Sequence, residues 1–296
     1  MASAVTPTAA EVVATFAQAT AANKATPVRL GNVLQLGPNA GEDVVVSADL
    51  HGHRANFDAI LALADLDHHP RRHLIMQEVC HGGPTYPGGG CMSHRMLEDV
   101  ARLKVRYPER FHFILSNHEL AELTEFPIMK SRKLLNVMFR LGLQEAYGAE
   151  SDQVRAAAVD FIASCPAAAR IGQTVFVSHS CPDRSDSDNF DAGIFARPYV
   201  QRDFCEGGPI FRLVWGRDFR LANAQAFAKT VNARVLVHGH EPCPMGYRIP
   251  NDRQIIIDCC NEQAAYVLLL PMGQQLEHAE VVKRLVRLET AKSAGV

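Results

Sequence analysis

The sequence has little of several features that define other classes of protein. No apolar run approaches the roughly 18 residues that a membrane span needs. The charges nearly cancel, because 30 Lys and Arg stand against 32 Asp and Glu for a formal net charge of −2. This balance argues against the basic surface of a nucleic-acid-binding protein. With 47% hydrophobic and 21% charged residues, the 296-residue chain is expected to be globular, with no nucleic-acid or membrane partner.

Several local motifs are also missing. None of the eight cysteines forms a C-x-x-C pair, which argues against a structural zinc site and favours reduced thiols in the cytosol. The first residues carry no basic segment, and Glu11 interrupts the apolar residues that follow, so we expect no signal peptide and a cytoplasmic location. There is no glycine-rich dinucleotide or Walker loop and no His-Cys-x5-Arg sequence of a cysteine-based phosphatase.

Segments of strand and helix type alternate along the chain, which predicts an α/β fold. The expected strands are 44–48, 73–76, 111–115, 174–178, 234–237, 254–257 and 266–270, and the expected helices are 8–23, 56–66, 92–107 and 223–231. Residues 82–90 and 181–209 are expected to be mostly loop, and 119–170 helical with a break near Gly148. We expect residues 1–43 to form an N-terminal extension of a helix and a strand. Residues 44–296 would form a single domain with a helical cap at about 120–170.

Polar side chains that can bind metal ions follow five of the predicted strands. In chain order they are Asp49 and His51, then Glu78, then Asn117 and His118, then His179, then His238 and His240. In open α/β sheets, ligands bind outside the carboxyl ends of the strands. Carboxylate together with imidazole suits Mn, Fe or Zn, and a carboxylate shared by two ions makes a dinuclear site. The five strand ends therefore predict a metal site.

The order of these residues resembles the calcineurin-like metallophosphoesterases, and more closely their phosphoprotein phosphatase branch. Asp49-Leu50-His51-Gly52 is similar to the motif G-D-x-H-G, with Ala48 at the first glycine. Asn117-His118-Glu119 is similar to G-N-H-E, and Trp215 also falls where that branch has a tryptophan. The resemblance covers roughly residues 44–270 and implies a sandwich of two mixed β-sheets flanked by helices.

The resemblance also implies a cofactor of two divalent metal ions, Mn, Fe or Zn. One ion would take Asp49 and His51, the other Asn117, His179 and His240, and Glu78 would be shared. His240 is preferred to His238 as a ligand because it lies seven residues before Tyr247, as in the family. The resemblance makes His118 the general acid and not a ligand.

The second motif of the family is altered here. Where the family has Gly-Asp-x-Val-Asp-Arg-Gly, this chain has Gln77-Glu78-Val79-Cys80-His81-Gly82-Gly83. His81 stands at the position of the Asp that orients the catalytic His, so it could orient His118, join the metals or point into solvent. The two phosphate-clamping arginines of the branch have no counterpart. We therefore expect arginines elsewhere to bind phosphate, namely Arg217, Arg220 and Arg54.

The implied activity is hydrolysis of a phosphate ester by a hydroxide that two metal ions activate. We expect a serine/threonine protein phosphatase-like phosphomonoesterase, with a phosphoprotein or a small phosphate ester as substrate. Hydrolysis of a nucleotide or a diadenosine polyphosphate is the alternative, because the arginine clamp is absent. A second alternative is a catalytically degenerate pseudophosphatase that serves as a binding module, for which Glu78 and His81 are the grounds.

Overall fold

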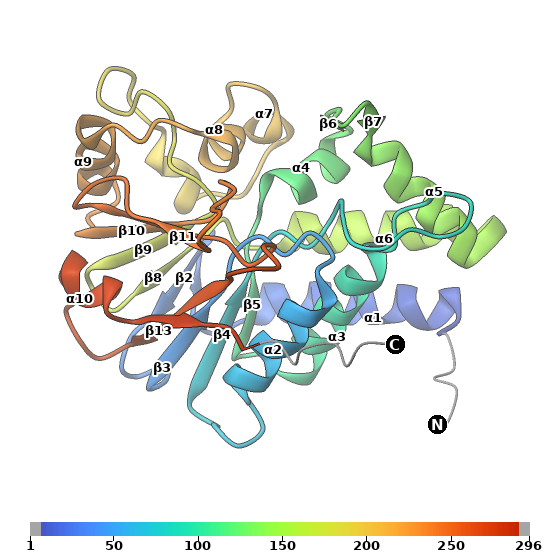
Figure 1. The fold of residues 1–296 in the computed structure, drawn as a ribbon, viewed down its shortest axis with the longest axis horizontal. Coiled ribbons are helices and arrows are strands. Elements are labelled where there is room, and N and C mark those ends of the chain that lie inside the picture. Colours follow the sequence, from blue (N-terminus) through green and yellow to red (C-terminus); the bar gives the residue numbers. More distant parts are fainter. Residues whose placement is uncertain (1–6, 290–296) are drawn as a thin grey trace.

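The computed structural model describes residues 7–289 and contains two large mixed β-sheets (Figure 1). The seven-stranded sheet has the order β1-β2-β8-β9-β10-β12-β11, and the five-stranded sheet has the order β14-β13-β3-β4-β5. The first consists of Arg29–Leu30 (β1), Val33–Leu36 (β2), Ala168–Ile171 (β8), Val175–Ser178 (β9), Val235–His238 (β10), Gln254–Ile257 (β12) and Tyr247–Arg248 (β11). The second consists of Leu285–Arg287 (β14), Tyr266–Pro271 (β13), Asp43–Val46 (β3), Arg72–Met76 (β4) and Phe111–Phe113 (β5).

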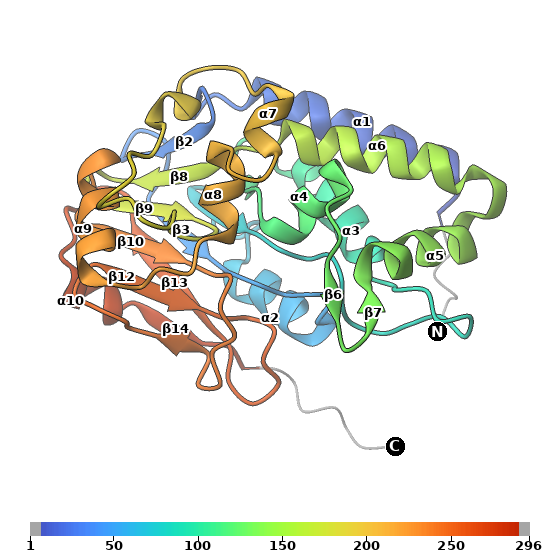
Figure 2. The same ribbon diagram turned by 90° about the horizontal axis from the view of Figure 1, so that it is seen from above.

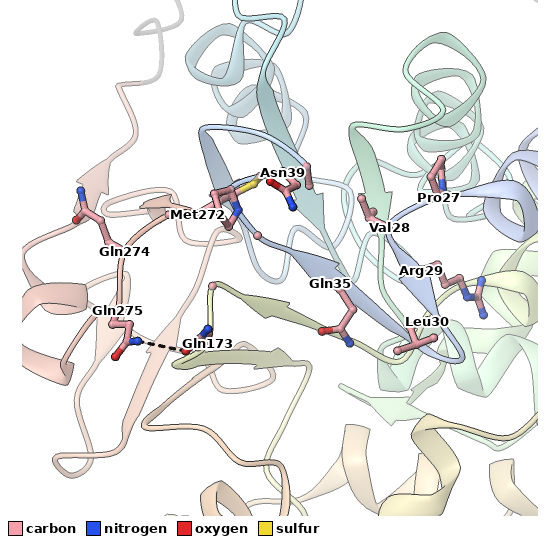
Figure 3. Close-up of a pocket in the computed structure, with 15 residues that line it drawn as sticks. Pro27, Val28, Arg29, Leu30, Gln35, Asn39, Gln173, Met272, Gln274 and Gln275 are labelled. Carbon is pink, nitrogen blue, oxygen red and sulfur yellow. Dashed lines mark hydrogen bonds between the residues drawn. The ribbon is translucent and has the colours of Figure 1, made fainter.

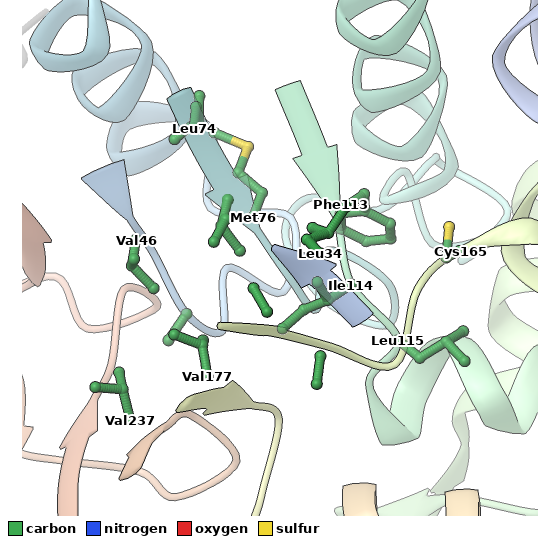
Figure 4. Close-up of a cluster of buried hydrophobic side chains, with 14 of the residues drawn as sticks. Leu34, Val46, Leu74, Met76, Phe113, Ile114, Leu115, Cys165, Val177 and Val237 are labelled. Atoms are coloured by element: carbon green, nitrogen blue, oxygen red, sulfur yellow. The ribbon is translucent and has the colours of Figure 1, made fainter. Parts of the chain in front are cut away.

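Parallel strands in both sheets direct their carboxyl ends to one place. β3, β4 and β5 run parallel to one another, and β9 runs parallel to β10. Val44, Val45 and Val46 are fully buried, as expected for a strand covered on both faces. Side chains of the two sheets meet in one hydrophobic core, where Val46 and Met76 face Val177 and Val237 (Figure 4). The core fixes the two sheets against each other and hence the loops that leave their strands.

Helices flank the sheets. Those before residue 170 are Ala9–Ala25 (α1), Arg54–Ala64 (α2), His94–Arg106 (α3), Asn117–Thr124 (α4), Leu135–Tyr147 (α5) and Ser151–Ser164 (α6), and the later ones are Gln201–Phe204 (α7), Pro209–Trp215 (α8), Leu221–Thr230 (α9) and His278–Val282 (α10). Two 3₁₀ turns occupy Gly148–Glu150 (η1) and Ala192–Phe195 (η2). α1 begins with a capping box between Thr8 and Glu11 and packs against α6 and α3. Figure 2 shows α1, α6 and α5 together on one side of the sheets and α9 on the other.

The fold class and the seven predicted strands are confirmed, with bounds shifted by one or two residues. The predicted helical stretch over 119–170 with a break near Gly148 is confirmed in part, because α4, α5 and α6 lie in it and α5 ends just before Gly148, but it is wrong in having no strands. A two-stranded hairpin, Met129–Lys130 (β6) with Lys133–Leu134 (β7), interrupts it, and β8 ends it. Strands of two residues are too short to show alternation, and the alanines of β8 give no strand pattern. α8 was not expected, and the 44–296 domain boundary stays a prediction.

Within residues 7–289, no helix combines the length and apolar character that a membrane crossing requires.

Candidate metal centre

Two overlapping groups of potential ligands lie where the carboxyl ends of the strands meet. One group is His51, Glu78 and His118, and the other is Glu78, His179 and His240. In each group, one ligand atom per residue lies within 4.8 Å of the others. Glu78 follows β4 and belongs to both groups. Four of these side chains lie in loops after β3, β4, β9 and β10, and His118 lies in the first turn of α4, which follows β5, so both sheets build the site.

Glu78 stands between the two groups with one oxygen turned to each. Its Oε1 lies 3.3 Å from Nε2 of His51 and 3.5 Å from Nε2 of His118. Its Oε2 lies against Nε2 of His179. The side chain is buried, and this burial raises the pKa of its carboxyl well above the usual range. Such a placement is the one that a carboxylate shared between two cations requires.

Asn117 and the two later histidines meet at a single oxygen. Oδ1 of Asn117 lies 2.6 Å from Nε2 of His179 and 3.0 Å from Nδ1 of His240. Among residues 7–289, Nε2 of His240 is buried without a hydrogen-bond partner, and so is Nε2 of His238. His238 differs in that its Nδ1 lies 3.1 Å from the carbonyl oxygen of Ser178 and the residue lies outside both groups. The structure therefore brings His240 to the site and leaves His238 behind it.

Asp49 lies next to the second group but outside it. Its Oδ1 accepts a hydrogen bond from the backbone N–H of His240 at 2.9 Å and lies 3.9 Å from Nδ1 of His179. Burial raises the pKa of Asp49 to about 8. Burial also lowers the pKa of His240 to about 3 and that of His179 well below its usual range, so both rings are neutral at pH 7. Because the raised pKa values also leave the Glu78 and Asp49 carboxyls protonated at pH 7 in the absence of a cation, they ionise only if a positive charge replaces their protons.

This donor set fits divalent cations. Two buried carboxylates, an amide oxygen and imidazole nitrogens match the ligands that Mn, Fe and Zn accept. The unpartnered Nε2 of His240 has a buried lone pair or proton with nothing to bind. A cation among these groups would supply both the missing partner and the missing positive charge. The residues present therefore fit the cofactor that the sequence predicts.

Side chains behind the ligands hold them in place, and sequence reasoning missed these roles. Oε1 of Gln77 lies 2.9 Å from Nδ1 of His179, while its Nε2 donates to the Ser47 carbonyl at 3.1 Å. Oε1 of Glu119 accepts hydrogen bonds from the N–H groups of Val79 and Cys80, both at 2.9 Å. Glu119 thereby ties the start of α4 to the loop that carries Glu78. The only sequence feature that points to this role is the place of Glu119 in the motif Asn117-His118-Glu119.

Four residues at this site adopt left-handed backbone conformations that are unusual for residues other than glycine. The φ angles are 44° at His51, 50° at Glu78, 64° at His81 and 68° at His240. Each such residue costs of order 1 kcal/mol or more, and such strain clusters at functional sites. These kinks turn the side chains toward each other, and no sequence pattern predicts them.

His81 occupies a buried position between His118 and Glu122. Its Nδ1 lies 3.0 Å from Nδ1 of His118, and its Nε2 lies 2.7 Å from Oε1 of Glu122. Because the His81 side chain has no exposed surface, the alternative in which it points into solvent is wrong. Because both of its ring nitrogens are engaged, neither is left for a metal ion. Glu122 lies four residues after His118, one turn further along α4, a spacing that could have indicated it.

The three candidate arginines differ in their surroundings. Arg217 pairs with Glu241. Burial is the main cause of the raised pKa of Glu78 and the lowered pKa of His240, and the charge of Arg217 opposes the first shift and adds to the second, which places it near the site. Arg54 lines a cavity of about 680 Å³ beside His51 and pairs with Asp99 at 2.7 Å. Arg220 is held by two carboxylates and is more than half exposed.

A second cavity, of about 700 Å³, lies away from this site (Figure 3). It is lined by residues such as Gln35, Gln173 and Met272. Gln173 follows β8, which is antiparallel to β9, and Met272 follows β13, which is antiparallel to β3. These residues therefore lie at the ends of the sheets opposite the metal-binding groups.

Comparisons with known proteins identify the fold. No protein-family model and no curated protein matches the sequence. A solved protein serine/threonine phosphatase from Saccharomyces cerevisiae, described as similar to human phosphatase PP5, aligns over 98% of this chain and 91% of its own. Its TM-score is 0.67 at 15% identity. A cold-active protein-tyrosine phosphatase of a psychrophilic Shewanella aligns over 88% of this chain and 83% of its own, with a TM-score of 0.53 and 15% identity. The chain therefore has the fold of the calcineurin-like metallophosphoesterases.

Proposed function

We propose that the chain is a metal-dependent phosphoesterase that acts as a serine/threonine protein phosphatase-like phosphomonoesterase. The observation that carries this proposal is the position of Glu78, whose two oxygens face two separate groups of neutral imidazoles. One ion would lie with Asp49 and His51 and the other with Asn117, His179 and His240, while Glu78 would be shared and His118 would not be a ligand. The shared fold with solved phosphatases supports the same reading.

Each part of the site has a role in this chemistry. Two bound cations would neutralise phosphate charge and lower the pKa of a water molecule. Nδ1 of His118 is held by His81 and its Nε2 faces the site, so an imidazolium at His118 could transfer the Nε2 proton to the leaving oxygen and return to the neutral ring. Arg217 and Arg54 remain the candidates for phosphate binding. Arg220 is not proposed to bind phosphate, because its guanidinium already donates hydrogen bonds to Asp186 and Asp218.

Metal content and turnover measured together test the proposal. We expect two Mn²⁺ per chain by mass spectrometry of the purified metal-loaded protein and turnover of p-nitrophenyl phosphate. Glu78→Gln should lose both ions, since this side chain serves both groups, whereas His240→Ala should lose one. His53→Ala is the matched control, because His53 lies beside the site but caps α2 through the N–H of Asn56. It should keep both ions and its activity.

Two outcomes would count against the proposal. Metal binding without turnover of any phosphate ester would favour the pseudophosphatase alternative. An unchanged metal content in Glu78→Gln would contradict the proposed dinuclear site, in which Glu78 is shared.

A further inference from the structure

The β6–β7 hairpin is a basic segment beside the metal-binding groups. Lys130, Ser131 and Lys133 line the same 680 Å³ cavity as His51 and His81. That volume is in the range of small-ligand sites. The wall carries three cationic side chains, those of Arg54, Lys130 and Lys133, against the single carboxylate of Glu262. The cavity next to the candidate centre is therefore electropositive.

The two lysines face each other directly. Lys130 of β6 pairs with Lys133 of β7 in the antiparallel register, so their side chains lie on the same face of the hairpin. Like charges in this position repel and destabilise a hairpin. Among residues 7–289, neither lysine has a carboxylate partner or a hydrogen bond to relieve that repulsion. An anion bound between them would relieve it.

The turn that joins the lysines is costly as well. Ser131 and Arg132 have φ angles of 50° and 61°, which is the pattern of a two-residue hairpin turn normally made by Asn-Gly. Neither residue is glycine, so the turn is strained. Backbone strain and charge repulsion both destabilise the hairpin, so stabilising the fold does not explain its presence.

The base of the hairpin is tied to the catalytic histidines. Oδ1 of Asn136 accepts from the N–H of Ile128 at 3.0 Å, and its Nδ2 donates to Oε1 of Glu122 at 3.1 Å. Glu122 in turn holds His81, which contacts His118. Burial lowers the pKa of both His51 and His118, and the positive charge of Lys130 adds to this lowering, in agreement with its position beside the site. The hairpin is therefore held in a defined place relative to the candidate centre.

We propose that Lys130 and Lys133 form a second phosphate-binding subsite, so that the preferred substrate at this site is a small molecule with two or more phosphate groups, such as a nucleoside polyphosphate cleaved at its terminal phosphoanhydride bond, and not a phosphoprotein. One phosphate lies at the metal-binding groups and another lies between the lysines. The subsite replaces the arginine clamp that the sequence lacks. This inference rests on the proposed function for the reaction, although anion binding by the hairpin stands independently of it.

Binding is tested first, without catalysis. The probe is inorganic tripolyphosphate, titrated by calorimetry into the metal-free protein at low salt. Lys130→Gln/Lys133→Gln should weaken binding about tenfold or more, because two charge-assisted contacts are lost. The matched control is Lys24→Gln/Lys229→Gln, which removes the same charge from exposed positions on α1 and α9. If both double variants weaken tripolyphosphate binding equally, net charge alone causes the effect and the proposal is overturned.

Turnover is tested second, with Mn²⁺-loaded protein. The hairpin variant should raise KM for ATP at least tenfold and leave KM for p-nitrophenyl phosphate within twofold. An equal effect on both substrates, or an effect only on a phosphopeptide with acidic flanks, would overturn the polyphosphate assignment. If the unaltered protein hydrolyses neither substrate but loses tripolyphosphate binding with the lysines, then the proposed enzyme activity fails while the anion subsite stands.

Discussion

His81 and His118 face each other through their Nδ1 atoms, 3.0 Å apart. Only one of these two nitrogens can carry the shared proton. Glu122 decides which, because its carboxylate accepts the N–H at Nε2 of His81 at 2.7 Å. Nδ1 of His81 is then the acceptor, Nδ1–H of His118 is the donor, and Nε2 of His118 is left facing Glu78. The family that the sequence resembles has an Asp at the position of His81. In this chain the carboxylate belongs to Glu122 instead, and His81 lies between it and His118.

Removing the charge of Glu122 should lower kcat. In Glu122→Gln the side-chain amide can donate instead of accept, which permits the wrong tautomer of His81 and releases His118. We expect kcat to fall by about 10²-fold, within the range for general acid–base catalysis, with little change in KM or metal content. Steady-state kinetics and metal analysis measure this. The double variant His81→Asp/Glu122→Gln should recover part of the loss, because an Asp oxygen can accept from Nδ1 of His118.

The matched control for that variant is a buried His–Glu pair elsewhere. Nδ1 of His94 lies 2.8 Å from Oε1 of Glu98, and both side chains are buried. Glu98→Gln should therefore lower thermal stability as Glu122→Gln does, but leave kcat within about twofold. A similar loss of kcat in both variants would show that Glu122 acts through stability alone.

Glu78→Asp should weaken metal binding even though the resemblance has an aspartate at this place. The shorter side chain draws both oxygens back by about 1.5 Å. The backbone at Glu78, with φ of 50°, is set for the longer one. We expect the affinity for Mn²⁺ to fall tenfold or more, measured by competition with a fluorescent chelator. Affinity equal to that of the unaltered protein would show that the loop adapts to either length.

Arg217 should contribute to substrate binding and Arg220 should not. Arg217→Gln removes the positive charge that acts on Glu78 and His240, so we expect KM for p-nitrophenyl phosphate to rise about tenfold. Arg220→Gln is the comparison, because the Arg220 guanidinium donates to Asp186 at 3.0 Å and is therefore not expected to bind substrate. Initial-rate measurements with both variants decide the matter, and a larger effect at Arg220 would reverse the assignment.

Gly82→Ala should disturb the site through the backbone. A Cβ at this position would stand 2.3 Å from the carbonyl oxygen of His51. The two loops that carry His51 and Glu78 would have to separate, at a cost of roughly 1–3 kcal/mol in stability and with loss of metal affinity. Gly37→Ala is the control, because nothing lies within 4 Å of its added Cβ. Thermal melts with and without Mn²⁺ compare the two.

Acid should destabilise the metal-free protein through a histidine pair remote from the site. His73 and His112 are buried, with Nδ1 of the first 3.0 Å from Nε2 of the second. Burial lowers the pKa of His73 to about 4 and that of His112 well below its usual range. The unfolded chain takes up protons near pH 6.5, whereas the folded chain does not. The stability is therefore complete above pH 6.5 and is lost as pH falls toward 4.

The difference between pH 7 and pH 5 measures this effect. In urea unfolding we expect the free energy to drop, and His73→Leu/His112→Leu should make the drop smaller by about 1–3 kcal/mol, while the buried histidines of the metal centre account for the rest. His68→Leu should leave the drop unchanged, because His68 is exposed and its hydrogen bond to Asp65 raises its pKa. A drop of the same size in the double variant would assign the effect to other groups.

The sequence was sufficient for the seven strands that it predicts and for the meeting of their polar ends, but not for short strands such as β8, β11 and β14. Runs such as 44–46 and 235–237 are apolar because both faces of these strands are buried. The residues that follow them therefore lie together at the carboxyl ends of the strands. It could not supply the left-handed backbone at His81 or His240, because φ depends on how the loops pack. Nor could it find the β6–β7 hairpin, whose strands are two residues long, or the partnership of Glu122 with His81, which depends on the exact course of α4.

The division of the ligands between two sheets has a consequence for biosynthesis. His51 and Glu78 leave the five-stranded sheet, whereas His179 and His240 leave the seven-stranded one. β13 and β14 belong to the five-stranded sheet but follow His240 in the chain, so that sheet is incomplete until residue 287 has emerged. A nascent chain cannot present a full coordination sphere before then. Metal loading would thus be a late, post-translational step, and the ions available to the finished protein would determine which ones it carries.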